Sequence, residues 1–100
     1  MVKIDFESDY RFRDSLADLG SLASIDVFAG LEKITSQQYS WEDFTKQFGW
    51  EPIALTGSDI FPGGNELHQF ILAAPSAQRY KIFGYTYENV VIICAVVRKA

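Results

Sequence analysis

The chain has very little sulfur and imidazole chemistry. Its 100 residues include one cysteine, Cys94, and one histidine, His68. A single cysteine excludes an intramolecular disulfide and is typical of a protein that works in a reducing cytoplasm. One cysteine and one histidine also provide no metal-ligand spacing, so we expect no metal site.

Long apolar runs and phosphate-binding glycine motifs are missing as well. The longest apolar run, Val90–Val97, is far shorter than the roughly 20 residues that a membrane-spanning helix needs. The first ten residues are acidic and lack the apolar core of a secretory signal. The glycines of residues 61–65, FPGGN, are not followed by the lysine and helix of a phosphate loop. These absences predict a cytoplasmic protein with no cofactor and no membrane partner.

Positive charge is scarce and unevenly placed. The net charge is −4, which argues against general nucleic-acid binding. Residues 1–67 hold twelve acids and five bases, whereas residues 68–100 hold one acid and four bases. The hydrophobic content of 48% is that of an ordinary globular chain, and the length suits a single domain spanning residues 1–100. That domain has room for one local anion-binding surface near its end.

Helical spacing occupies the first half of the chain and predicts a helical hairpin over residues 8–34. Ser8 and Ser21 can cap its two helices, and Gly20 marks the break between them. The apolar residues expected to face the core are Phe12, Leu16, Leu19, Leu22, Ile25, Phe28 and Leu31. A short third helix is expected between Ser40 and Gly49, with the aromatic face Trp41, Phe44 and Phe48.

Strand patterns lie at the two ends of the chain. The expected strands are Val2–Phe6, a brief one or a loop anchor at Ile53–Leu55, then Glu66–Ala73, Arg79–Tyr87 and Val90–Arg98. The last is apolar on both faces, which predicts a central strand. We therefore expect an α+β fold: an N-terminal strand, a helical hairpin with a short third helix, then a three-stranded antiparallel meander with the helices on one sheet face.

The strand Arg79–Tyr87 carries the candidate binding residues. Alternation puts Arg79, Lys81 and Tyr85 on one face, and cations mixed with aromatic rings can hold phosphates and stack bases. The alternative is a strand whose cations are solvated and whose rings fill the core. His68 is the one side chain suited to acid–base catalysis near neutral pH, although a lone histidine is more often a polar strand residue.

The terminal hairpin concentrates the cations. A simple register through a turn at Glu88–Asn89 brings Arg79 close to Arg98 and Lys99. Like charges opposite one another are unfavourable without an anion. The hairpin therefore predicts a basic site for a phosphate or for an acidic partner.

Residues 78–100, QRYKIFGYTYENVVIICAVVRKA, resemble the end of chains in the RelE/ParE superfamily of bacterial toxins. Both have an arginine–tyrosine pair opening an apolar strand, an acidic turn, a long β-branched strand and a basic pair. Residues 2–20, VKIDFESDYRFRDSLADLG, are similar to the opening strand and first helix of that family, and the order of elements is similar throughout.

The resemblance implies the toxin component of a type II toxin–antitoxin pair, with a cognate antitoxin as partner. Some family members cut messenger RNA at the ribosome. Arg79 would match the arginine that opens the penultimate strand, and Arg98 and Lys99 the basic pair after the last strand. These groups could stabilise the charge that develops when a 2′-hydroxyl attacks the adjacent phosphate. His68 is then a further catalytic candidate, and Lys81, Lys99 and Tyr85 are candidates for binding RNA or an acidic partner.

The chain departs from the family in its charges. Its helices are acidic, and the strand that contains His68 carries none of the lysines that family members often have there. A second interpretation is therefore a small acidic inhibitor or immunity-type protein, without catalysis, whose helical acids cover a basic partner. A third is a homologue that only forms a homodimer.

Overall fold

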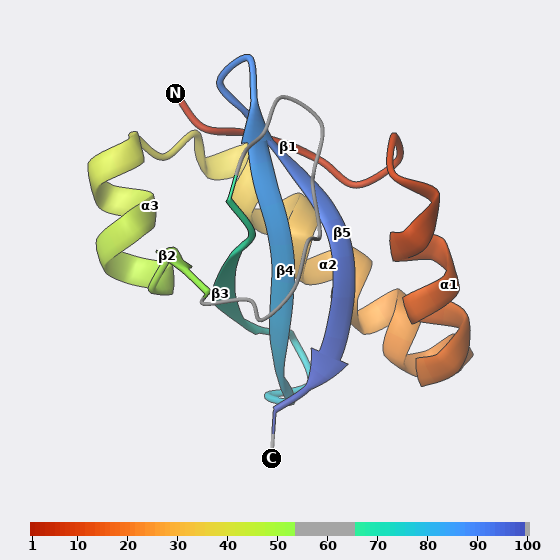
Figure 1. The fold of residues 1–100 in the computed structure, drawn as a ribbon. Helices are drawn as coiled ribbons and strands as arrows, with labels where there is room; N and C mark the ends of the chain where they lie inside the picture. Colours follow the sequence, from red (N-terminus) through yellow and green to blue (C-terminus); the bar gives the residue numbers. More distant parts are fainter. Residues whose placement is uncertain (54–65, 100) are drawn as a thin grey trace.

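Three helices cover one face of a mixed β-sheet in the computed structural model, which describes residues 1–53 and 66–99. Figure 1 shows α2 crossing behind the sheet, with α1 beside β5 and α3 beside β3. The elements in chain order are β1 (Lys3–Asp5), α1 (Tyr10–Leu19), α2 (Ser21–Gln37), α3 (Trp41–Phe48), β2 (Glu51–Pro52), β3 (His68–Ala73), β4 (Arg79–Tyr87) and β5 (Val90–Arg98).

The sheet has five strands in the order β1-β5-β4-β3-β2. The predicted antiparallel meander is present as β3, β4 and β5. The sheet is larger than this meander, because β1 adds parallel to β5 and β2 adds antiparallel to β3. The second addition lies at Glu51–Pro52 rather than at the expected Ile53–Leu55, of which residues 54 and 55 lie outside the described part of the chain.

The helical hairpin is confirmed, with its break at Gly20, where φ is 97°. Its caps differ from the prediction. Asp9, not Ser8, caps α1, since its carboxylate accepts the backbone N–H of Arg11 at 3.0 Å. The predicted cap Ser21 is already the first residue of α2, and Gly20 occupies the capping position without a side-chain hydrogen bond.

The third helix begins and ends as predicted. The backbone N–H of Asp43 donates to the Ser40 hydroxyl at 3.1 Å, which satisfies one of the open donors of the first turn. Gly49 ends the helix in the left-handed conformation, with φ of 71°. Among residues 1–53 and 66–99, no helix is long and apolar enough to cross a membrane.

The buried face of α2 differs from the predicted stripe. Leu22 and Ile25 are 85% and 68% exposed. The buried residues of α2 are Ala23, Val27, Gly30, Leu31 and Ile34. Small residues let the helix lie close to the sheet: a Cβ atom at Gly30 would lie 2.9 Å from Cδ1 of Leu72 on β3. The close approach of α2 to β3 therefore determines which face of α2 is buried, and it leaves Leu22 and Ile25 in solvent.

β5 is an interior strand, as predicted, since it lies between β1 and β4. Val91 and Ile93 are fully buried in the core between sheet and helices. Ile92 and Cys94 belong to a second apolar cluster, in which they join Tyr85 of β4. The strand is thus buried on both faces, which explains its unbroken apolar sequence.

Candidate functional site

The alignment of β4 with β5 decides where the cations lie. Near the turn the two strands follow a simple hairpin register, which would place Arg79 opposite Arg98. A β-bulge between Phe83 and Gly84 changes this register, because β5 contains one extra residue there, Cys94. Beyond the bulge every residue of β5 is therefore moved by one position relative to β4.

The bulge separates the two arginines. Arg98 is paired with Tyr80, and Lys99 takes the position opposite Arg79, where its backbone N–H donates to the Arg79 carbonyl at 2.9 Å. Residues directly opposite each other share a sheet face. The backbones of Arg79, Arg98 and Lys99 do meet at one end of the hairpin, as predicted, but Arg98 points to the helix face together with Tyr80.

Arg98 is attached to the helical hairpin. Its Nη2 donates to the carbonyl of Leu19 at 3.2 Å, and Leu19 is the last residue of α1. The free carbonyls at a helix C-terminus carry partial negative charge, so a guanidinium is favourable there. Arg98 also lines a hollow of about 510 Å³ with Leu22, Asp26 and Tyr80. Its position is that of a residue joining β5 to α1.

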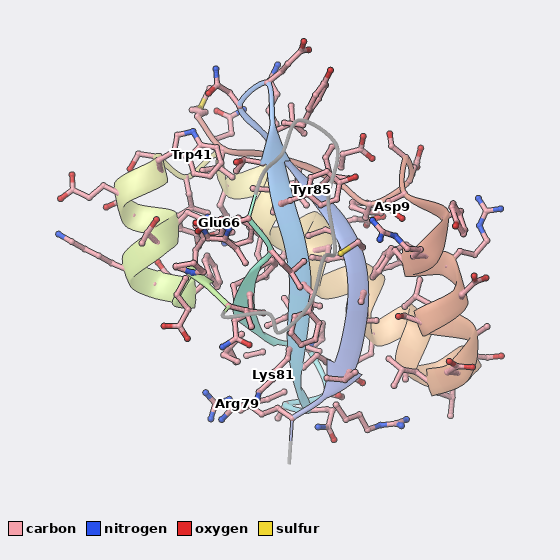
Figure 2. All side chains as sticks on the ribbon, in the orientation of Figure 1. Asp9, Trp41, Glu66, Arg79, Lys81 and Tyr85 are labelled. Carbon is pink, nitrogen blue, oxygen red and sulfur yellow. The ribbon has the colours of Figure 1, made fainter. Side chains whose placement is uncertain are left out.

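The other three cations of the β4–β5 hairpin and the residue after it are Arg79, Lys81 and Lys99, and we call them the cation cluster. The register places all three on the sheet face opposite the helices, at the open end of the β4–β5 hairpin. Figure 2 shows Arg79 and Lys81 together at that end of β4. No residue of the cluster has an ion pair among the described parts of the chain. Positive charge is thus available there for an anion.

Lys33 of α2 is a cation near this end of the sheet that the sequence did not indicate. It lines a hollow of about 390 Å³ between α2, α3 and β3, together with Arg79. Polar side chains of the same hollow are Gln37, Tyr39 and Gln47. Lys33 and Gln37 lie one helical turn apart on α2, which is a common surface spacing. Only the packing of α2 against β3 brings them near Arg79.

His68 lies at the other end of β3. Its ring stacks on Trp50, with ring centroids 4.8 Å apart, and its Nδ1–H donates to the Glu66 carbonyl at 3.0 Å. Ala73 is paired with Arg79, so His68 is about 16 Å from Arg79 along the strand. The structure therefore does not bring the predicted acid–base residue to the cation cluster.

Tyr85 is also remote from the cluster, about 20 Å from Arg79 along β4. Its hydroxyl donates to Oδ2 of Asp9 at 3.1 Å. Burial, reinforced by that hydrogen bond, raises the pKa of Tyr85 to about 12. Figure 2 shows Tyr85 on the side of β4 that leads toward Asp9 at the start of α1. The predicted RNA-stacking residue instead connects the sheet to a helix N-terminus.

Asp9 lies at the centre of a set of hydrogen bonds with Arg11 and Tyr85 that the sequence did not indicate. Its two carboxylate oxygens accept hydrogen bonds from Nε and Nη2 of Arg11, at 2.9 and 2.6 Å. These bonds lower the pKa of Asp9 below its ordinary value. Arg11 also lines a hollow of about 370 Å³ with Cys94, and burial raises the pKa of that thiol to about 11. At neutral pH the thiol is therefore protonated and a weak nucleophile.

Replacing Asp9 with Ala is expected to lower the free energy of unfolding by about 2 kcal/mol, because a helix cap and a charged hydrogen-bond pair are lost together. The pKa of Asp9 is depressed in the fold, so its contribution is complete above the unfolded pKa and disappears as the pH falls through the folded value. Urea unfolding at neutral pH and below about pH 4 should show the difference from wild type shrinking in acid. The exposed Asp14 provides the control, and an equal loss in Asp14→Ala would contradict the assignment.

The described residues contain no group of three or more histidine, cysteine, aspartate or glutamate side chains arranged to hold a metal ion. Comparison of the chain with protein-family models, with curated proteins and with solved structures found no match.

Proposed function

We propose that the protein is the toxin component of a type II toxin–antitoxin pair and that it acts through the cation cluster on a phosphate-bearing cytoplasmic target. The observation that carries this proposal is the placement of Arg79, Lys81 and Lys99 on one sheet face of an acidic protein. Three cations that close together favour an anion between them. A nucleic-acid backbone is an anion of the required kind.

The arrangement of the elements supports the same proposal. An N-terminal strand, a helical hairpin and an antiparallel three-stranded meander follow one another as in the family that the sequence resembles. The basic passage that resembles the family most closely, residues 78–100, is also the passage that forms the β4–β5 hairpin and the cation cluster.

Ribonuclease activity is the more specific form of the proposal. Arg79, Lys81 and Lys99 can bind phosphates and stabilise charge that develops on one of them. Cleavage also needs a group that removes the 2′-hydroxyl proton, and His68 lies too far away to serve the same phosphate. In this form of the proposal, a group of the target itself, such as the ribosome, would supply that step.

The second candidate function is binding without catalysis, as an acidic inhibitor or immunity-type protein. The position of His68 favours it, because the ring is held against Trp50 instead of facing the cations. Under this alternative the exposed acids of α1, such as Asp14 and Asp18, would bind a basic partner, and the cation cluster would have no functional role.

Induced expression in a bacterial host distinguishes these functions. The wild-type protein should arrest growth, and a variant with Arg79→Gln and Lys81→Gln should not, because two of the three anion-binding groups are lost. A variant with Lys3→Gln and Lys46→Gln has the same net charge and keeps the cluster, so it should arrest growth like wild type. Circular dichroism of each purified variant establishes that it is folded.

The state of cellular messenger RNA separates the two forms of the toxin proposal. Messenger RNA cut within minutes of induction would support ribonuclease activity, whereas growth arrest with intact messenger RNA would support another phosphate-bearing target. If wild type does not arrest growth, or if the Arg79→Gln, Lys81→Gln variant arrests it equally well, the toxin proposal is wrong. If partner binding is lost on replacing Asp14 and Asp18 and not on replacing Arg79 and Lys81, the inhibitor hypothesis is favoured.

A further inference from the structure

The outer edge of β3 is paired over only part of its length. The even-numbered residues along this strand exchange backbone hydrogen bonds with β4 or the turn before it, and the Ala74 N–H donates in this way to the Gln78 carbonyl at 3.0 Å. Because the two sides alternate along a strand, the odd-numbered residues of β3 direct their N–H and C=O groups away from β4. On the outer side, the Ile53 N–H donates to the Leu67 carbonyl at 2.9 Å, and Gln69 is paired with Glu51. There β2 ends.

Beyond Gln69 the same edge continues with Ile71 and Ala73. By the alternation of the ladder, their N–H and C=O groups point outward, and none of the described residues pairs with them there. Open edge groups of this kind form a template for another extended segment. The length of the open edge suits a short strand that continues the line of β2.

The surroundings of this edge are basic. The hollow of about 390 Å³ that runs along Ile71, Leu72 and Ala73 is also lined by Lys33 and Arg79. No aspartate or glutamate is found among its described lining residues, and the amides of Gln37 and Gln47 offer further hydrogen-bonding groups. Within the hollow, a segment bound along the edge would therefore meet two cations and no carboxylate of the described lining. The carboxylate of Glu51, farther along the same edge, accepts a hydrogen bond from the Gln69 amide at 3.0 Å.

We propose that the open edge at Ile71–Ala73 binds an extended, acidic segment of a partner protein, which adds to the sheet as a strand beside β3. Its backbone pairs with Ile71 and Ala73, and its carboxylates lie near Lys33 and Arg79. This inference does not depend on the proposed toxin function, because it rests on the sheet edge and on α2 rather than on the cation cluster as a whole.

A peptide fits this edge better than RNA or a second copy of the chain. A peptide strand offers N–H donors and C=O acceptors at the same spacing as the outward groups of Ile71 and Ala73, whereas the phosphates of RNA are acceptors only. A second copy that paired edge to edge through β3 would bring Lys33 and Arg79 of both chains together, and like charges oppose each other. An acidic strand satisfies both the backbone groups and the cations.

The test uses a short acetylated peptide, Thr-Glu-Val-Glu-Val-Glu-Thr, and the same peptide N-methylated throughout, which keeps the charges and loses the backbone donors. Hydrogen exchange measured by NMR should show the Ile71 and Ala73 amides about tenfold slower with saturating unmethylated peptide. The methylated peptide should give no protection. Equal binding of both peptides, or unchanged exchange at both amides, would overturn the proposal.

Variants of residues outside the cation cluster locate the site. Ala73→Pro removes an outward donor while leaving the β3–β4 ladder intact, and it should abolish peptide binding. Lys33→Glu should weaken binding by about tenfold or more, whereas Lys46→Glu, the same charge change on exposed α3, should stay within about twofold. Equal weakening by both charge changes would show that no particular edge is used.

Two competing occupants are tested in the same experiment. A uridine oligonucleotide that protects Ile71 and Ala73 when the peptide does not would overturn the proposal in favour of nucleic acid. Protection of these amides that grows with protein concentration, accompanied by a dimer in sedimentation, would overturn it in favour of a second copy. The growth test is separate from the peptide test. If the Lys33→Glu and Ala73→Pro variants still arrest growth, the toxin proposal stands, and a negative peptide result then counts only against strand binding at this edge.

Discussion

Replacing Phe44 with Ala is expected to lower the free energy of unfolding by about 3–5 kcal/mol. The side chain is fully buried, with 0% of its surface exposed. Its ring lies 5.3 Å from that of Phe70 on β3 and 5.7 Å from that of Trp50, measured between centroids. Phe44 therefore holds α3 against the sheet, and its removal leaves a cavity where the helix meets β3.

Urea unfolding followed by tryptophan fluorescence measures this loss, because Trp50 is part of the same aromatic group. Tyr10→Ala is the matched control: it removes an aromatic ring that is 73% exposed and should change the free energy by less than about 0.5 kcal/mol. A Phe44→Ala variant as stable as the Tyr10→Ala variant would mean that α3 is not docked through this ring. A loss of this size is a large part of the 5–15 kcal/mol typical of small domains.

The parts of the fold that could be predicted are those with local causes. The α1–α2 hairpin follows from apolar spacing and from the break at Gly20, and α3 follows from the Ser40 cap and its aromatic face. The meander follows from alternating strands joined by short turns. Positive φ at Glu88 and Asn89 satisfies the tight β4–β5 turn that the sequence indicated.

The parts that could not be predicted depend on contacts between distant segments. Nothing local to Lys3–Asp5 specifies that it pairs with β5 rather than with another strand. On α2, apolarity alone favoured Leu22 and Ile25 for the core, whereas the need to approach Leu72 closely selected the face that contains Gly30. A hydrophobic pattern records which residues avoid water, but not how close two elements come.

The candidate site was predicted in its backbone and in the shared face of Arg79 and Lys81, but not in the face of Arg98. The hairpin turn correctly brings Arg79, Arg98 and Lys99 to one end of the sheet. The face on which Arg98 and Lys99 lie depends on a single extra residue in β5, and one residue is enough to reverse a strand's faces. Lys33 was missed because it reaches this end of the sheet only through the packing of α2.

Replacing Gly84 with Ala is the second substitution with a large expected effect, about 2–3 kcal/mol lost from the free energy of unfolding. Gly84 lies at the bulge, and a Cβ atom there would be 2.5 Å from the backbone carbonyl oxygen of Ile92. A backbone oxygen cannot turn aside as the end of a side chain can. The two strands must therefore separate or the bulge must move.

Thr86→Ala, on the same strand, is the control and should cost no more than about 1 kcal/mol, the range of strand propensities. Because the bulge sets the register of the hairpin end, Gly84→Ala should also shift the NMR signal of the Lys99 amide, which donates to Arg79. Thr86→Ala should leave that signal in place. Wild-type stability in the Gly84→Ala variant, with an unmoved Lys99 signal, would show that the bulge does not control the position of the cation cluster. Loss of stability together with a moved signal would tie the arrangement of Arg79 and Lys99 to the one residue of β4 that has no side chain.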